Sequence, residues 1–517
     1  MSKKKTYLFH SGAQPLENFE DALTDCSYMW ADPVNLNKHK LSPVFKNNVF
    51  NHDYLFAYFF LDKTSPWLKD VKLLMQLPAH RILYSDDAEI PVNISQALQL
   101  RGAYKINLAN LADDVNHYFF NVDVGYRVSI DQLELNSDLQ NRITYYGDSY
   151  FNVEANFGSQ WQYLGQLSYS VSVVERYATT LKVEMQTTGS AELMVEVKCF
   201  NSDRQLIKTI SKSGEQLLAD NGEIEITGIE TKFFYSIYYY VRGKGNVRIG
   251  TLHQRRSRGK YGFLDLGGNK IIDRNALNGE IAYLFNPGNM QPPLTVYFAG
   301  YHSAETFEAR GMLHSKGVPY LLISDLRVEG GTFYLGDEEV ENKLLTVIKD
   351  CLAKLHFETK DLVLSGISMG TYASMYYGAL LSPGDIVIAK PLMDLGTIAE
   401  NLRINRPDEF HCSTDMVLML EGNNDHEACQ KVDDIMWQRI KEGDFSKTDF
   451  VLGYMRNDDY DRFAYNKLQD FLQQYYPDRH VISKGYYGRH NDDSASIAAW
   501  FEQQLYHILR SKYGQKF

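Results

Sequence analysis

Apolar runs of strand length alternate with helix-compatible segments between Thr6 and about Phe120. The runs are Tyr7 to Phe9, Tyr54 to Leu61, Arg81 to Tyr84 and Tyr104 to Leu108. Strands that alternate with helices are typical of a sheet covered by helices. We therefore expect a small N-terminal α/β domain, to which we assign residues 1–122.

The period of the apolar pattern changes to two between about Gly125 and Leu252. The apolar positions are Leu181, Val183 and Met185 in one run and Leu193, Val195, Val197 and Cys199 in another. Turn signals such as Asn221-Gly222 separate such runs. A period of two indicates strands with one buried face. Residues 123–255 are therefore predicted to form a central antiparallel β-sandwich or jelly roll.

This predicted sandwich is rich in aromatic residues. They include Tyr145, Tyr146, Tyr150, Trp161, Tyr163 and Tyr169. Aromatic faces suit the apolar face of a sugar ring, so carbohydrate binding is one interpretation. The other is that β-sheets favour aromatic residues anyway, and it accounts for most of them.

Residues 256–517 return to apolar runs followed by helical segments. The runs are Leu294 to Phe298, Tyr320 to Asp325, Leu362 to Leu364, Phe450 to Met455 and His480 to Ser483. This order predicts a mostly parallel sheet with helices on both faces.

The pentapeptide Gly366-Ile367-Ser368-Met369-Gly370 lies between the run at Leu362 and a small-residue helical stretch, Thr371 to Leu381. This context predicts a nucleophile elbow, in which a sharp strand-to-helix turn exposes the hydroxyl of Ser368. The flanking glycines are needed because a Cβ would clash in so tight a turn. The backbone N–H of Met369 would then face a developing oxyanion.

An acid and a histidine follow the elbow in the order that an α/β-hydrolase requires. A carboxylate-rich loop follows the run ending at Met455, and we favour Asp458 as the catalytic acid, with Asp459 and Asp461 as alternatives. His490 ends a glycine-rich loop after the last run and precedes a C-terminal amphipathic helix. The expected fold is therefore α/β, with a C-terminal α/β-hydrolase domain, an N-terminal α/β domain and a central antiparallel β-sandwich.

These three residue types work as a unit. A serine hydroxyl is a weak nucleophile near neutral pH, so the imidazole of His490 would take its proton during attack, while a carboxylate orients and stabilises that imidazole. The acyl group would stay on Ser368 until a second nucleophile arrives. Water as that nucleophile would make the protein an esterase, and a sugar hydroxyl would make it an acyltransferase.

Two further positions lie at predicted strand ends. Gly300 and Tyr301 follow the run at Leu294 and are candidates for the second oxyanion donor, although an ordinary turn containing a glycine is an equal alternative. Arg327 follows the run at Tyr320 and either orients a substrate or pairs with a neighbouring carboxylate. We favour the pairing.

The chain has 517 residues and a net charge of −12, which argues against general nucleic-acid binding. The cluster Arg255 to Lys260 is the exception, and we interpret it as an exposed linker, with contact to a partner or an anionic membrane surface as the alternative. Five scattered cysteines indicate reduced thiols. No apolar run approaches membrane-spanning length. We expect a cytoplasmic protein with no metal site and no bound cofactor.

Four segments together resemble the second accessory Sec system proteins of Gram-positive bacteria. They are Leu364 to Thr371, Val296 to Tyr301, Leu322 to Gly331 and Tyr454 to Asp461. The resemblance covers the whole chain and is most specific in its last half. It implies an acetyltransferase that O-acetylates N-acetylglucosamine on a serine-rich repeat adhesin and supports export of that adhesin.

The resemblance also implies partners and site residues. The partners are the first and third accessory Sec proteins, the accessory Sec ATPase and the glycosylated adhesin, with peripheral attachment to the membrane through that complex as an alternative to a purely cytoplasmic location. The nucleophile corresponds to Ser368 and the base to His490. The acid lies within Asp458 to Asp461, where the family has glutamate, so an aspartate is one methylene shorter. Acetyl coenzyme A is the candidate donor, and a non-enzymatic export adaptor and a carbohydrate esterase are the alternative functions.

Overall fold

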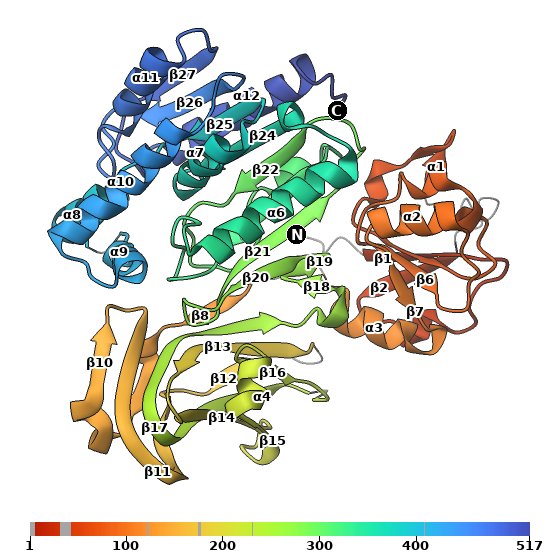
Figure 1. The fold of residues 1–517 in the computed structure, drawn as a ribbon. Coiled ribbons are helices and arrows are strands. Elements are labelled where there is room, and N and C mark those ends of the chain that lie inside the picture. Colours follow the sequence, from red (N-terminus) through yellow and green to blue (C-terminus); the bar gives the residue numbers. More distant parts are fainter. Residues whose placement is uncertain (1–5, 31–42, 121–123, 174–176, 230, 408) are drawn as a thin grey trace.

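The computed structural model describes residues 6–30, 43–120, 124–173, 177–229, 231–407 and 409–517. Three large sheets account for most of the strands in those ranges. Figure 1 shows them as an N-terminal α/β unit, a strongly curved central sheet and a C-terminal sheet flanked by helices. The mixed α/β class predicted from the sequence is confirmed.

The N-terminal unit contains a five-stranded parallel sheet with the order β2-β1-β5-β6-β7. Its strands are β1 Thr6–Ser11, β2 Cys26–Trp30, β5 Tyr58–Leu61, β6 Ile82–Ser85 and β7 Tyr104–Ile106. The helices are α1 Val71–Leu74, α2 Val92–Leu100 and α3 Leu111–Tyr118, and a small separate pair is β3 Phe45–Lys46 with β4 Val49–Phe50. All four residues of β5 are buried, as expected for a parallel strand covered on both faces.

The central unit is an antiparallel sheet of ten strands. They are β8 Tyr126–Val128, β9 Leu133–Leu135, β10 Ile143–Tyr146, β11 Tyr150–Leu167, β12 Val171–Val173, β13 Thr179–Thr187, β14 Glu192–Phe200, β15 Leu206–Ser213, β16 Glu223–Ile226 and β17 Phe233–Arg256, with a short helix, α4 Gly214–Ala219. The antiparallel pairing agrees with the period of two. The first half of β17 pairs with β14 and its second half pairs with β13.

The two-sheet sandwich predicted for this region is not what forms, because β11 and β17 run continuously through the whole sheet (Figure 1). The pairing of β17 with β11 is irregular near Gly243 and Gly245, whose φ values are +85° and +147°. A Cβ at Gly243 would lie 1.9 Å from the carbonyl oxygen of Ser190, so only glycine fits there. The sheet curves around a single apolar core. The period of two in the sequence indicates strands, but it does not indicate that one long strand pairs along both halves of a curved sheet.

The aromatic residues of this unit have mixed surroundings. The rings of Tyr146 and Tyr150 stack with centroids 4.7 Å apart, and the guanidinium of Arg242 lies 4.4 Å from the ring centroid of Trp161. Tyr145 and Tyr169 are exposed. The contacts of the first three aromatic residues are ordinary sheet-surface packing. Glycan binding by this unit stays a prediction.

The C-terminal sheet has eight strands in the order β20-β21-β23-β22-β24-β25-β26-β27, parallel from β23 to β27. They are β20 Asn269–Asp273, β21 Gly279–Asn286, β22 Leu294–Phe298, β23 Tyr320–Asp325, β24 Leu362–Ile367, β25 Asp385–Ala389, β26 Asp449–Met455 and β27 Val481–Tyr486. A separate pair of two-residue strands, β18 Gly262–Phe263 and β19 Asp265–Leu266, precedes them. The mostly parallel sheet is as predicted.

Helices cover both faces of this sheet (Figure 1). They are α5 Arg310–His314, α6 Glu338–Leu355, α7 Met369–Leu381, α8 Leu395–Asn405, α9 Ser413–Glu421, α10 His426–Glu442, α11 Ala464–Tyr475 and α12 Ser494–Ser511. Leu362 and Leu364 of β24 pack into one apolar core, whereas Val363 packs into the core on the other face. Both faces of the central strands are therefore buried, which explains their continuous apolar runs. None of the helices in the described ranges is both long and apolar enough to cross a bilayer.

The basic cluster near the end of β17 is only partly exposed: the prediction of an exposed linker is wrong for Arg255 and Arg258, whereas Arg256 and Lys260 are exposed. Arg255 and Arg258 are 4% and 2% exposed. The guanidinium of Arg255 donates to Glu305 and, at 2.5 Å, to Glu280, while Arg258 donates to the carbonyl oxygen of Phe120 at 2.7 Å. Arg255 and Arg258 therefore join the curved sheet to both neighbouring units. The sequence pattern does not indicate that these arginines are buried, because their partner groups are distant along the chain.

Glu305 is a fully buried carboxylate at the contact between the curved sheet and the C-terminal sheet. It accepts hydrogen bonds from His253 and Arg255, and the Nε of Arg127 lies 3.3 Å from it. Burial alone would raise the pKa of Glu305, but the charges of Arg255 and His253 hold that pKa well below its ordinary value. Glu305 therefore stays ionised and compensates two buried cationic groups of β17.

We predict that Glu305→Gln destabilises the protein by roughly 3 kcal/mol or more, because it leaves Arg255 without one of its buried counter-charges. Urea unfolding followed by tryptophan fluorescence measures this change. The matched control is Glu339→Gln, since Glu339 pairs with Lys343 on the exposed face of α6 at 2.5 Å. That control should cost less than about 1 kcal/mol. Equal costs for the two variants would contradict a structural role for the Glu305 charge.

Candidate active site

Ser368 occupies a sharp turn between β24 and α7. Its φ of 56° and ψ of −118° are unusual for a residue with a Cβ, and such strained conformations are concentrated at functional sites. The N–H of Ser368 donates to the carbonyl oxygen of Ala389 in the neighbouring β25 at 2.9 Å. Ser368 is half-buried, whereas all of α7 except Leu380 is buried. The turn therefore presents a hydroxyl at the carboxyl edge of the sheet.

The two glycines of the pentapeptide are required by close backbone contacts. A Cβ at Gly366 would lie 2.6 Å from the carbonyl group of Gly370, and a Cβ at Gly370 would lie 2.0 Å from the carbonyl oxygen of Phe298. Both contacts are with backbone atoms, which cannot move aside cheaply. The glycine spacing thus brings α7 against β24 and the end of β22, as the elbow prediction requires.

Three predicted side chains form a continuous hydrogen-bonded chain. The Oγ of Ser368 lies 2.8 Å from Nε2 of His490, and Nδ1 of His490 lies 2.8 Å from Oδ2 of Asp458. His490 and Asp458 are 2% and 6% exposed. The serine follows β24, the aspartate follows β26 and the histidine follows β27, so three parallel strands, with β25 between β24 and β26, deliver them to one sheet edge.

Further contacts hold the imidazole in place. The ring of Tyr460 stacks on that of His490 with centroids 4.3 Å apart and an interplanar angle of 6°. The second oxygen of Asp458 accepts the N–H groups of Tyr460 at 2.9 Å and Asp461 at 3.3 Å. The carboxylate is thereby fixed with one oxygen toward the backbone and one toward the histidine. This is the geometry in which a carboxylate sets the imidazole tautomer.

The two alternative acids have other contacts. Asp459 accepts the backbone N–H of His490 at 3.0 Å and pairs with Arg406 at 2.8 Å. Asp461 accepts the N–H groups of Met393 and Asp394 at 2.8 and 2.9 Å. Neither carboxylate lies within hydrogen-bond distance of the imidazole. Their positions support the preference for Asp458, and its catalytic role stays a prediction.

The candidate oxyanion donors differ from one another. The N–H of Gly300 donates to the carboxylate of Glu308 at 2.7 Å and so is already occupied. The N–H groups of Met369 and Tyr301 donate no hydrogen bond to any described residue. Met369 begins α7, where helix N–H groups have no partner within the helix. Met369 and Tyr301 are therefore better placed to receive an oxyanion than Gly300.

Arg327 belongs to the support of the site. It donates to both oxygens of Asp325, at 2.9 and 2.7 Å, and to Asp273 at 2.7 Å. The prediction that it pairs with carboxylates is confirmed. Asp325 also accepts the N–H of Tyr334 at 3.0 Å, and the Tyr334 hydroxyl donates to the carbonyl oxygen of Ala299 at 2.8 Å. The segment just before Gly300 is thus held by this buried ion pair.

Several further residues surround the site without a clear motif in the sequence. Phe410 packs on Tyr301 with ring centroids 5.0 Å apart and stacks on Tyr460 at 6.3 Å. The ammonium group of Lys390 donates to Ser494 at 2.7 Å, and burial lowers its pKa although the charge of Asp458 opposes this. Only Tyr460 carried a sequence signal, because it lies between the candidate acids.

The arrangement brings a serine hydroxyl, an imidazole, a carboxylate and backbone N–H groups that have no partner among the described residues to one edge of the sheet. These are the parts needed for acyl transfer through a serine. Within the described ranges, no three His, Cys, Asp or Glu side chains are grouped so that they could hold a metal ion.

Comparison with known proteins gives one family. The chain matches the family described as "Accessory Sec system GspB-transporter" over residues 25–515. An accessory Sec system protein of Staphylococcus aureus is 33% identical over 434 residues, which are 84% of this chain and 81% of that protein. One of Streptococcus gordonii is 35% identical over 408 residues, or 79% of each chain.

A solved structure is similar along the whole chain. It is a chain of the Glycosylation Associate Protein complex from Streptococcus agalactiae, with a TM-score of 0.84 and 29% sequence identity. The match covers 100% of both chains. The arrangement of all three units is therefore shared with that protein.

We predict that substitutions of Asp458, Asp459 and Asp461 change the rate at which a fluorophosphonate probe labels Ser368 to different extents. Such probes react with activated serines. Asp458→Asn should slow labelling of Ser368 by about 10³-fold or more, because an amide favours the wrong imidazole tautomer. Asp459→Asn and Asp461→Asn should slow it by less than about tenfold, since neither residue touches the ring. A large effect of Asp459→Asn with a small one of Asp458→Asn would reverse the assignment of the acid.

Asp461 should make the stability of the protein depend on pH. Burial, and then the charge of Asp394, raises the pKa of Asp461 to about 7. The unfolded chain has a carboxyl pKa of about 3.9, so the folded state binds this proton more tightly, and the contribution of Asp461 to stability falls as pH rises from about 4 to about 7. Asp461→Asn does not titrate. Its Tm relative to the unchanged protein should rise by several degrees between about pH 5 and about pH 8.

The control for this measurement is Asp470→Asn on the exposed side of α11. Its Tm should follow that of the unchanged protein across the same pH range. A Tm difference for Asp461→Asn that is constant with pH would show that Asp461 is ionised throughout.

Proposed function

The chain belongs to the accessory Sec system GspB-transporter family, and from that premise we propose that it O-acetylates N-acetylglucosamine on a glycosylated serine-rich repeat adhesin. The observation that carries this proposal is the continuous contact from Asp458 through His490 to Ser368 beside the free N–H of Met369. A scaffold protein has no need of a strained serine with an oriented base. The arrangement thus supports a serine-dependent acetyltransferase.

The reaction has two steps. As Oγ of Ser368 attacks the acetyl carbonyl carbon of the donor, its proton passes to Nε2 of His490, and the departing group then takes that proton as its bond to carbon breaks. The acetyl-serine is attacked in turn by a sugar hydroxyl, which gives its proton to Nε2, and Oγ regains a proton on release. Asp458 stabilises the imidazolium in both steps. Met369 and Tyr301 offer N–H groups to the carbonyl oxygen.

The strand order supports a hydrolase-type catalytic unit. Nucleophile, acid and histidine follow β24, β26 and β27 in the chain order Ser, Asp, His that α/β-hydrolases have. We assign this unit to residues 256–517, the N-terminal unit to 1–122 and the curved sheet to 123–255. The donor is proposed to be acetyl coenzyme A or another activated acetyl ester, with no resident cofactor.

The proposed partners are the first and third accessory Sec proteins, the accessory Sec ATPase and the adhesin, in the cytoplasm. Support for an assembly comes from the similar solved chain, which belongs to a complex. A second role as an export adaptor is favoured by the description of the family as a transporter. That role would use surfaces away from Ser368, so the two functions are separable.

The test is Ser368→Ala expressed beside the adhesin, with acetylation measured by mass spectrometry and export measured in the same cells. We expect acetylation to be lost and export to continue. His490→Ala should match Ser368→Ala, because members of such a unit lose activity together and their losses do not add. Asp470→Asn is the control and should retain both activities.

Each outcome distinguishes the candidate functions. Unchanged acetylation in Ser368→Ala would remove the catalytic proposal, and loss of export alone would favour the adaptor. If the purified protein releases acetate from a donor but never acetylates the adhesin glycan, it is an esterase.

A further inference from the structure

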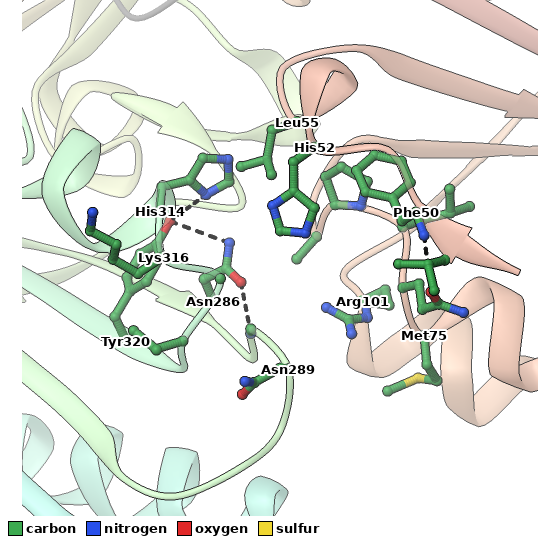
Figure 2. A pocket seen from close by; sticks show the side chains of 18 of the residues that line it. Phe50, His52, Leu55, Met75, Arg101, Asn286, Asn289, His314, Lys316 and Tyr320 are labelled. Atoms are coloured by element: carbon green, nitrogen blue, oxygen red, sulfur yellow. Dashed lines mark hydrogen bonds between the residues drawn. The ribbon is translucent and has the colours of Figure 1, made fainter. Parts of the chain in front are cut away.

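A cavity of about 390 Å³ lies between the N-terminal unit and the C-terminal sheet. Figure 2 shows His52 and Arg101 extending from the N-terminal unit toward Asn286 and Asn289 of the C-terminal sheet. This volume is within the range of small-molecule sites. The cavity is separate from the Ser368, His490 and Asp458 side chains. Asn286 ends β21 and Tyr320 begins β23, so the cavity lies at the opposite ends of the strands from Ser368.

Arg101 is an uncompensated buried cation in this cavity. It follows the last residue of α2, is 5% exposed and lines the cavity. Its guanidinium makes no ion pair or hydrogen bond with any described residue, and its Nε is buried without a partner. Burial lowers the pKa of Arg101 to about 10 with no neighbouring charge to offset the effect. Buried charges are normally paired.

Other buried arginines of the protein show what is missing at Arg101. Arg255 contacts the carboxylates of Glu280 and Glu305, and Arg327 contacts those of Asp325 and Asp273. None of the described residues that line the cavity is an aspartate or a glutamate. A guanidinium that faces a cavity with no protein carboxylate is suited to an anion from solution.

The rest of the polar lining is also of one sign or neutral. His52 is exposed at the cavity and its ring nitrogens bond to no described residue, and Lys516 lies at the rim. Burial, and then the charges of Arg310 and Arg81, lower the pKa of His314 to about 3, so it stays neutral. The ammonium group of Lys316 lies over the ring of Tyr506 at 4.6 Å, so its charge is engaged elsewhere.

The remaining walls combine apolar side chains with the side-chain amides of Gln76, Asn286 and Asn289. The apolar side chains include those of Val49, Phe50, Leu55, Met75, Leu77, Pro78 and Val318. The amide of Asn286 is fixed, because it donates to the Tyr320 hydroxyl at 3.2 Å and accepts the N–H of Gly288 at 2.9 Å. A cavity with one buried guanidinium and apolar walls suits a ligand with an anionic group and an organic body. An inorganic ion would leave the apolar walls uncovered.

We propose that this cavity binds a small organic phosphate ester, whose phosphate pairs with Arg101 and also meets His52 and Lys516. Phosphate is favoured over a single carboxylate because three basic side chains gather without a counter-charge, and a phosphate monoester carries close to two negative charges near neutral pH. The ester bridges the N-terminal unit and the C-terminal sheet. Its binding therefore stabilises their contact and leaves the chemistry at Ser368 unchanged.

The experiment uses the full chain and three probes: inorganic phosphate, adenosine monophosphate and glucose 6-phosphate. Thermal unfolding and calorimetry should show saturable binding of at least one ester, tighter than that of inorganic phosphate. Arg101→Gln should weaken this binding by about tenfold or more. Arg142→Gln is the matched control and should bind as the unchanged protein does, since Arg142 is an exposed arginine just before β10.

The stability of the Arg101 variant without ligand shows whether Arg101 binds a ligand or supports the fold. Because Arg101 has no partner, Arg101→Gln should unfold at the same or a higher temperature than the unchanged protein when phosphate is absent. His52→Gln, at an exposed position, is a second variant that should also weaken ester binding. Fluorophosphonate labelling of Ser368 should be the same in all these variants.

Three results would overturn the proposal. They are no binding of either ester at millimolar concentration, equal binding by the unchanged protein and Arg101→Gln, and binding to phosphatidylglycerol vesicles without binding to the soluble esters. The last result would identify a lipid headgroup as the source of the phosphate. Failure of Ser368→Ala to alter acetylation would leave this inference untouched, since the two sites are at opposite edges of the sheet.

Discussion

The close backbone contact among β22, β24 and α7 is the constraint on which the candidate site depends. Gly370 lets the first turn of α7 approach the end of β22, and Gly366 lets the chain reverse at Ser368. The strained serine therefore owes its position to buried backbone on both sides and not to its own side chain. The same contact brings the start of α7 next to the segment that ends in Tyr301. The candidate nucleophile and the candidate backbone donors are thus placed by one packing arrangement.

The three aspartates that follow β26 show how surroundings assign different roles to identical side chains. Asp458 contacts the imidazole of His490, whereas Asp459 contacts the backbone of the same residue and Arg406. Asp461 is buried beside Asp394, which makes it hard to ionise. A loop rich in carboxylates can therefore contain one that contacts the imidazole of His490, one that bonds to the backbone of that residue and one that fixes a neighbouring loop.

The sequence predicted the features that local pattern controls. Short segments were enough to predict the glycine spacing around Ser368 and a strand before each candidate residue. They were also enough to predict the chain order serine, aspartate, histidine and the parallel sheet. The sequence did not predict contacts that depend on distant groups. The burial of Arg255 depends on Glu280 and Glu305, and the loss of the Gly300 N–H to Glu308 depends on the path of the loop between them. The continuous curve of β17 depends on pairing with strands on both sides.

The curved sheet is part of the support of the candidate site and not a detachable module. Arg127 of β8 donates to the carbonyl oxygens of His302 and Ser303, at 3.2 and 2.9 Å, just after the candidate donor Tyr301. Farther along the chain, Asp415 of α9 accepts the N–H of Asp148 in the turn between β10 and β11 at 2.8 Å. The curved sheet therefore contacts both the loop after β22 and the helices that follow β25. These contacts explain why the curved sheet lies against the C-terminal unit.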